Sequence, residues 1–264
     1  MNKAMTADHT FETPRLGKRI KSMLRLDFYR LFRTPIFYIM VVVSALIPVL
    51  ILSMGGAENP QTGEVSIEFI NVWQMIEGHS GNTTGLMDFS GMANINMLFI
   101  FAALLISIFV AHDYSSGFVK NIFSVHAKKS DYIVSKTVIG MFGGVCMILS
   151  YTLVTLIVGA FMGKSFDLGG ANMGNVILCL LSKAFLMGLF VPLYLGFAVL
   201  FKQRLWVTII ATFAAGILFY PVASAAVPLD STAVHLLISV IVAAAGFFGI
   251  GTLSTLVLNK RDLA

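Results

Sequence analysis

Six long apolar runs, separated by shorter polar segments, dominate the pattern of this sequence. A helix that crosses a bilayer needs about 20 predominantly apolar residues. The second run reaches that length only when the uncharged residues 91–96 are added to it. The pattern predicts an all-α polytopic membrane protein with six transmembrane helices, at about residues 36–54, 92–111, 137–162, 175–201, 205–227 and 233–258.

Basic residues concentrate on one side of the predicted membrane. Eight Lys and Arg residues precede the first run, and this side receives 16 of the 18 basic residues in all. Seven acidic residues and Lys164 fall in the loops of the other side. Because basic segments translocate poorly, we expect both termini in the cytoplasm. Residues 1–15 are expected to form a flexible tail, and residues 35–264 a single membrane domain.

Composition leaves no room for a separate soluble domain. Of the 264 residues, 57% are hydrophobic and 12% are charged, which is about half the charged share of soluble domains. The net charge of +5 therefore reflects membrane topology rather than nucleic-acid binding. The segment after Val158 lacks the first glycine of a phosphate-binding loop, and His and Cys do not cluster at metal-ligand spacing. We expect no enzyme activity, no cofactor and no metal in this chain.

Residues 16–34 have the pattern of an amphipathic helix at the inner membrane surface. Apolar side chains recur at three- and four-residue spacing on one face, and basic side chains lie opposite. Pro35 ends this helix before the first span. Asp27 falls within the apolar face, where it either pairs with Arg30 or contacts another subunit. The residues expected to act in the interfacial helix are Arg25, Phe28, Arg30 and Arg33.

The inner loop between the second and third predicted spans carries apolar residues at helical spacing. Phe118 and Ile122 predict a short amphipathic helix. Ser130 and Asp131 favour a helix start, so the third span should begin before it enters the membrane. A solvated basic turn is the alternative. Exposed apolar anchors such as Phe118, Ile122 and Phe123 instead favour docking on a membrane surface or in a protein groove.

The outer loop at about residues 55–96 contains no Lys or Arg. Val65, Phe69 and Trp73 fit one face of a short helix on the outer membrane surface, with Trp73 as its interfacial anchor. Two roles stay open for this loop, namely a surface anchor and a contact with a transported substrate.

Lys183 is the only charge well inside a predicted span. Its long side chain either extends outward to the membrane surface or serves a cavity or a subunit contact.

Small residues at four-residue spacing permit close helix contacts, within the chain or between subunits. The pairs are Gly140 with Gly144, Ala211 with Ala215, and Ala245 with Gly249. Pro221 suggests that the fifth span breaks into a short re-entrant piece.

An interfacial helix, a first span, a long outer loop and a second span that runs into a patterned inner loop resemble the permease subunits of ABC type-2 exporters. The resemblance covers nearly the whole chain. In that family the inner loop has an acidic residue, a glycine, a short amphipathic segment, a basic stretch and a Lys that opens the third span. The corresponding residues here are Asp113, Gly117 with Phe118, residues 119–123, Lys128 with Lys129, and Lys136.

The resemblance implies a dimer of permeases, formed with a second copy or a paralogue, in a bacterial plasma membrane. Each permease would dock on a separate cytoplasmic ABC ATPase subunit, which binds the ATP and Mg. The inner loop would be the coupling helix, and the implied cargo is a drug, an antimicrobial peptide or a lipid. The residues implied in coupling are Asp113, Gly117, Phe118, Ile122, Phe123, Lys128 and Lys129. A different class of function is a non-transporting membrane scaffold or immunity protein that acts through its outer loop.

Overall fold

The computed structural model describes residues 16–54, 71–77, 94–124, 128–201 and 204–260, and it describes their side chains except those of residues 54 and 219–226. All regular elements within these ranges are helices, which confirms the all-α class. The predicted tail, residues 1–15, and most of the outer loop lie outside the described residues.

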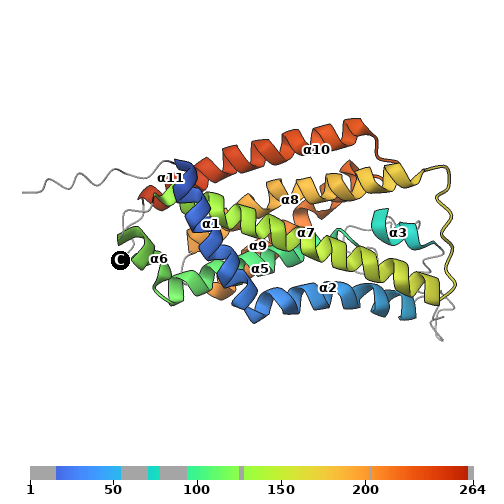
Figure 1. Cartoon of the computed structure of the whole chain (residues 1–264), viewed down its shortest axis with the longest axis horizontal. Coiled ribbons are helices and arrows are strands. Elements are labelled where there is room, and N and C mark those ends of the chain that lie inside the picture. Colours follow the sequence, from blue (N-terminus) through green and yellow to red (C-terminus); the bar gives the residue numbers. More distant parts are fainter. Residues whose placement is uncertain (1–15, 55–70, 78–93, 125–127, 202–203, 261–264) are drawn as a thin grey trace, which may run out of the picture.

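The helices form an elongated bundle with two different ends (Figure 1). Helices α1, α6 and α11 gather at one end, here called the α6 end, and α3 lies toward the other, the α3 end. In chain order the helices are α1 (Leu16–Arg33), α2 (Pro35–Met54), α3 (Val72–Glu77), α5 (Met97–Ser115), α6 (Phe118–Ser124), α7 (Lys129–Phe161), α8 (Met173–Phe201), α9 (Leu205–Ala226), α10 (Ala233–Ala245), the π-helix η1 (Gly246–Ile250) and α11 (Gly251–Lys260).

Five helices among the described residues are long and apolar enough to cross a membrane. They are α2, α5, α7, α8 and the continuous helix of α10, η1 and α11. The chain is therefore a multi-pass membrane protein. Helix α9 adds a shorter apolar segment, Leu205–Leu218, so the sixth span stays a prediction, as does the cytoplasmic side of the termini. Helix α9 continues past Pro221 to Ala226, and the suggested re-entrant break is not observed.

Helix α7 is longer than a membrane crossing requires. Its 33 residues correspond to about 50 Å, against about 30 Å of bilayer hydrocarbon. It begins at Lys129, ahead of the predicted span at residue 137, as the helix-start signal at Ser130 and Asp131 indicated. The first turns of α7 therefore extend beyond the apolar span at the α6 end, where they can hold polar side chains.

Small residues let α7 approach its neighbours closely. A Cβ atom added at Gly140 would lie 2.4 Å from Ile106 Cδ1 of α5, and one at Gly144 would lie 2.8 Å from Met187 Sδ of α8. Both distances are shorter than a normal contact of a Cβ atom, so a side chain at either position would require the Ile106 or Met187 side chain to shift. This predicted pair therefore acts within the chain.

The apolar face of α1 packs on the protein itself. Met23 and Leu31 are buried, and the Phe28 ring packs edge-on against Phe142 of α7 with 5.1 Å between centroids. The extended start of α7 offers this face a protein surface, and the location of α1 at the membrane surface stays a prediction. Pro35 opens α2 at the first helical position, where its missing N–H costs nothing.

Helix α3 is buried in the bundle instead of lying on its outer surface. Val72, Met75 and Ile76 have no exposed surface, and Trp73 is 5% exposed. Trp73 Nε1 donates a hydrogen bond to the carbonyl of Phe166 at 2.9 Å. The predicted surface helix with Trp73 as membrane anchor is therefore wrong for residues 72–77, while Val65 and Phe69 lie outside the described residues.

The π-helix η1 offers two glycines with opposite surroundings. A Cβ at Gly246 would lie 2.7 Å from Leu189 Cα, a backbone atom that cannot turn aside, whereas a Cβ at Gly249 would have no neighbour within 4 Å. Of the predicted pair Ala245 and Gly249, Gly249 thus makes no close contact within the chain. The close approach in this region uses Gly246.

We expect Gly246→Ala to lower the free energy of unfolding by about 1–3 kcal/mol, because the added methyl group forces α8 and η1 apart. The matched variant Gly249→Ala should be neutral, or stabilising by up to about 1 kcal/mol through helix propensity. Thermal unfolding of the two purified variants in the same detergent measures the difference. Equal midpoints would show that this close packing contributes nothing.

Candidate functional site

Four charged side chains meet at the α6 end and form what we call the charge cluster. Asp27 and Arg30 come from α1, Asp113 from the last turn of α5 and Lys136 from α7. Asp27, Asp113 and Lys136 have no exposed surface, and the side chain of Arg30 is 18% exposed. Two carboxylates and two cations make the cluster formally neutral, which is the condition under which charges are tolerated in a protein interior.

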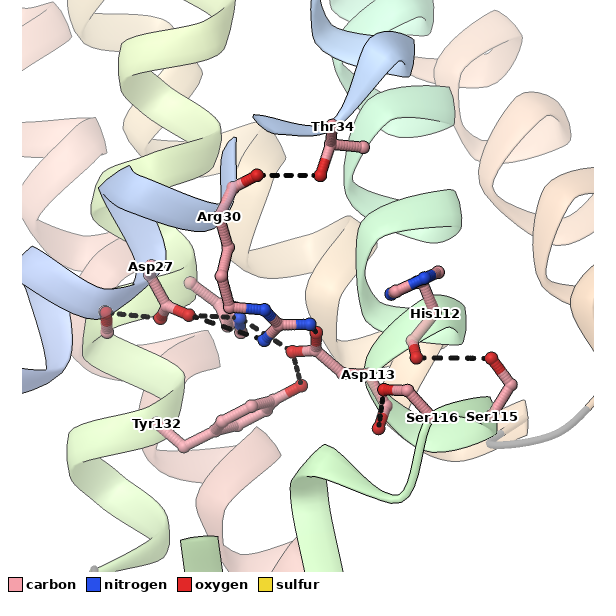
Figure 2. A network of polar contacts seen from close by, with 10 residues as sticks. Asp27, Arg30, Thr34, His112, Asp113, Ser115, Ser116 and Tyr132 are labelled. Carbon is pink, nitrogen blue, oxygen red and sulfur yellow. Dashed lines mark hydrogen bonds and ion pairs between the residues drawn. The ribbon is translucent and has the colours of Figure 1, made fainter. Parts of the chain in front are cut away.

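Lys136 lies between the two carboxylates. Its Nζ atom is 2.6 Å from Asp27 Oδ1 and 2.7 Å from Asp113 Oδ2. Arg30 Nη2 is 2.5 Å from Asp113 Oδ1, and Arg30 Nη1 is 3.9 Å from Asp27 Oδ1. Figure 2 shows Arg30 extending from α1 toward Asp113. The cluster joins three helices that are far apart in the sequence.

Two hydroxyl groups complete the shell of the carboxylates. Ser135 Oγ donates to Asp27 Oδ2 at 2.6 Å, and Tyr132 Oη donates to Asp113 Oδ2 at 3.1 Å, as Figure 2 shows for Tyr132. Positions 132, 135 and 136 are three and four residues apart, so one face of α7 presents all of these donors. Charge-assisted hydrogen bonds of this kind are among the strongest that side chains make.

Aromatic rings cover the cations of the charge cluster. The Arg30 guanidinium carbon is 3.6 Å from the centroid of the Phe118 ring, the first residue of α6. Lys136 Nζ is 4.3 Å from the centroid of the Phe109 ring on α5. Both contacts are within the range of cation–π attraction. Arg30 thus contacts α5 and α6 at the same time.

Gly117 makes the sharp turn between α5 and α6. Its φ angle is +70°, which side chains with a Cβ rarely adopt. Its N–H donates to the carbonyl of Tyr114 at 3.2 Å, and its own carbonyl accepts from the N–H of Asn121 at 3.1 Å. The glycine that the inner-loop motif singled out therefore sets the direction in which α6 leaves α5.

The apolar residues of α6 face the protein. Phe118, Ile122 and Phe123 are half-buried, and the Phe123 ring packs edge-on against Tyr132 with 5.8 Å between centroids. Within this chain they are not the exposed anchors that the sequence suggested. The Phe118 ring packs against Arg30 and the Phe123 ring against Tyr132. Among the described residues between 118 and 128, the exposed ones are Lys120, Asn121, Ser124 and Lys128.

The other predicted site residues have different surroundings. Lys129 Nζ donates to the carbonyl of Leu258 at 2.8 Å, which ties the start of α7 to α11. Arg25 and Arg33 are exposed, and the Arg33 guanidinium carbon lies 4.4 Å from the Tyr29 ring centroid. Of the four predicted residues of the interfacial helix, Arg30 alone enters the charge cluster, while Phe28 packs on Phe142.

Lys183 lies in the other half of the bundle and is completely buried. Its Nζ atom donates to the carbonyl of Glu77 at 3.1 Å and to Asn96 Oδ1 at 2.9 Å. The side chain therefore contacts the end of α3 and the start of α5. Of the two roles left open for Lys183, extension to the membrane surface is not what the structure shows.

The pairing of Asp27 with Lys136 is what inspection of the sequence missed. The sequence directed attention to Arg30, one turn from Asp27, but that contact is the longest in the cluster. Two features of the sequence could have indicated the pair: Asp27 lies in the apolar face of the first helix, and Lys136 lies at the start of the third predicted span. Among the described residues, no group of three or more His, Cys, Asp or Glu side chains is arranged to hold a metal ion.

Comparison with known families assigns the chain. A family model described as ABC-2 family transporter protein matches residues 23–219, about three quarters of the 264 residues. The chain belongs to the ABC-2 transporter family. Searches of curated proteins and of solved structures returned no significant match. The matched region includes every residue of the charge cluster, so this ABC-2 transporter protein carries the cluster within its family domain.

Removing one member of the charge cluster should be more damaging than removing a matched pair. Lys136→Met leaves Asp27 with Arg30 only at 3.9 Å, so we expect a loss of about 3–5 kcal/mol in the free energy of unfolding. Combining it with Asp27→Asn restores neutrality around Arg30 and Asp113, and the double variant should lose less than the sum of the single losses.

A double-mutant cycle in detergent measures this coupling. The exposed Lys120→Met is the control, with an expected change within about 0.5 kcal/mol. Additive losses in the double variant would contradict the assignment of Asp27 as the partner of Lys136.

Proposed function

We propose that this chain is the membrane-spanning permease subunit of an ATP-binding-cassette exporter. It moves an amphipathic or peptide-like cargo, such as a drug, an antimicrobial peptide or a lipid. A separate cytoplasmic ATPase subunit binds and hydrolyses the ATP with its Mg, and two permease chains form the working unit. Membership of the ABC-2 family supports the transport role, and the low charge content is consistent with a chain that carries no ATPase domain of its own.

The observation that carries the proposal is the contact of Arg30 with both Phe118 and Asp113. A force applied to α6 acts on the Phe118 ring and therefore on Arg30 of α1. From Arg30 it reaches α5 through Asp113, and Asp113 is bonded in turn to Lys136 of α7. The inner loop is thus connected to the first amphipathic helix and to two long apolar helices by short contacts that are buried or half-buried.

The buried charges make this connection stiff. Separating a cation from its carboxylate in a buried site leaves both without compensation, at a cost of several kcal/mol. Displacement of α6 is therefore expected to move α1 and the ends of α5 and α7 together rather than to break the cluster. Gly117, between α5 and α6, is the position at which the backbone can change direction at the lowest cost.

The surface available to an ATPase is polar and basic. Lys120, Asn121, Ser124 and Lys128 are exposed, whereas Phe118, Ile122 and Phe123 face inward. Docking is therefore proposed to use the exposed residues, against an acidic groove in the ATPase, and the inward residues transmit the movement. This differs from direct docking of the three apolar residues, whose replacement would disturb the chain itself.

Purification of the tagged full-length chain from its native membranes should recover an ABC ATPase subunit, identified by mass spectrometry. Reversing two exposed charges with Lys120→Glu and Lys128→Glu should lower that recovery about tenfold, because charge complementarity favours encounter and register. The control Lys260→Glu changes an exposed lysine on α11 and should leave recovery unchanged.

Recovery of the chain without any ABC ATPase, under mild crosslinking that preserves weak complexes, would contradict the exporter proposal. It would favour the scaffold or immunity role, in which the partner binds at the outer loop. Equal recovery of the ATPase with the doubly reversed variant would instead show that α6 is not the docking element.

A further inference from the structure

Lys183 is a buried cation whose two hydrogen-bond acceptors are neutral. It lies ten residues after the start of α8, about 15 Å along the helix axis. Its two acceptors, the Glu77 carbonyl and Asn96 Oδ1, are uncharged. No carboxylate of the described residues lies within ion-pair distance of its Nζ atom. Lys136 differs in this respect, because two carboxylates lie within 2.7 Å of its Nζ atom.

The start of α5 adds further positive potential at the same place. Asn96 is the N-cap residue of α5, and its side chain makes no capping hydrogen bond. The amino end of a helix carries a partial positive charge and attracts anions. Lys183 Nζ donates a hydrogen bond to this residue. A buried ammonium group therefore lies at the amino end of α5, where the partial positive charge of the helix repels it.

The Asn96 side chain has unused donors. Asn96 has no exposed surface, and its Nδ2 atom has no hydrogen-bond partner. Its Oδ1 atom already accepts from Lys183. The amide NH₂ group can therefore only donate, and the ammonium group of Lys183, with two of its three N–H bonds in use, can also only donate. A buried amide donor without an acceptor costs about 1–3 kcal/mol.

Glu77 contacts Lys183 through its backbone carbonyl, and its carboxylate makes a different hydrogen bond. Its Oε1 atom accepts from the N–H of Leu229 at 3.3 Å. Its side chain also lines a cavity of about 540 Å³ at the α3 end, together with Asp167 and Asp230. That cavity is acidic, so it does not itself attract an anion. Lys183 donates a hydrogen bond to the carbonyl of the same residue and is not one of the residues that line this cavity.

We propose that Lys183, Asn96 and the start of α5 form a binding site for one monovalent anion, a halide or a carboxylate. The anion accepts hydrogen bonds from Lys183 Nζ and Asn96 Nδ2 and neutralises the buried ammonium group. The donor-only set excludes a metal cation, and the single positive charge does not match a phosphate dianion. The two sources of such an anion are the medium, as chloride, and a cargo that carries a carboxylate.

Thermal unfolding of the purified full-length chain in detergent tests the site without any ATPase or cargo. Sodium gluconate, whose anion is too large for a buried site, is replaced at constant sodium by chloride or acetate. A ligand that binds only the folded state raises the unfolding midpoint in a saturable way. We expect a rise of several degrees in chloride, in acetate or in both. Chloride alone would indicate a resident halide, and a rise in acetate would indicate a carboxylate site.

Asn96→Asp is the decisive variant, because it places a carboxylate of the same shape beside Lys183. It should raise the midpoint in gluconate above that of the parent and remove the response to chloride and acetate. Lys183→Met should also remove the response, and Asn96→Asp decides alone if that variant fails to fold. The control Glu77→Gln should keep the response.

Three results would overturn the anion site. They are a parent chain with the same midpoint in all three salts, an Asn96→Asp variant that responds like the parent, and a response that disappears in Glu77→Gln. None of these results bears on recovery of an ATPase, so the anion site and the exporter proposal fail independently.

Discussion

Lys136 is held at the α6 end by carboxylates from two different helices, 2.6 Å and 2.7 Å away. Burying an ammonium group without exposed surface costs several kcal/mol, which opposite charges close by can offset. Asp27 supplies that charge from α1 and Asp113 from α5, and Arg30 balances the second carboxylate. The position of α1 against α7, and with it the assembly of the whole α6 end, follows from this requirement.

The same requirement determines what the inner loop can do. Because Arg30 must reach Asp113, its guanidinium group lies over the first ring of α6. The apolar residues of that short helix then pack inward, and its polar residues remain exposed. The proposed coupling role of α6 rests on this arrangement, in which the inner face packs on the bundle and the polar residues are exposed.

The two ends of the bundle treat buried charge differently. At the α6 end two cations face two carboxylates, whereas Lys183 has neutral acceptors and the amino end of α5 beside it. The end of α3 contacts Lys183 through the Glu77 carbonyl, and Trp73 Nε1 of α3 donates a hydrogen bond to the carbonyl of Phe166. The charges of the cluster balance one another, whereas the anion that we propose would balance Lys183. We regard this asymmetry as the main physical distinction between the two ends.

The sequence by itself determined the helical class, most of the long apolar helices, the amphipathic helix from Leu16 to Arg33 and the inner-loop motif around Gly117, because periodicity, length and charge are local properties. It also marked Asp27 and Lys183 as charged residues in apolar surroundings, and Lys136 as the lysine that opens the third span in the inner-loop resemblance. Only the tertiary structure decided their partners, the inward face of α6 and the burial of α3. Partner choice depends on which helices lie side by side, and an Asp on α1 and a Lys on α7, 109 residues apart, share no local pattern.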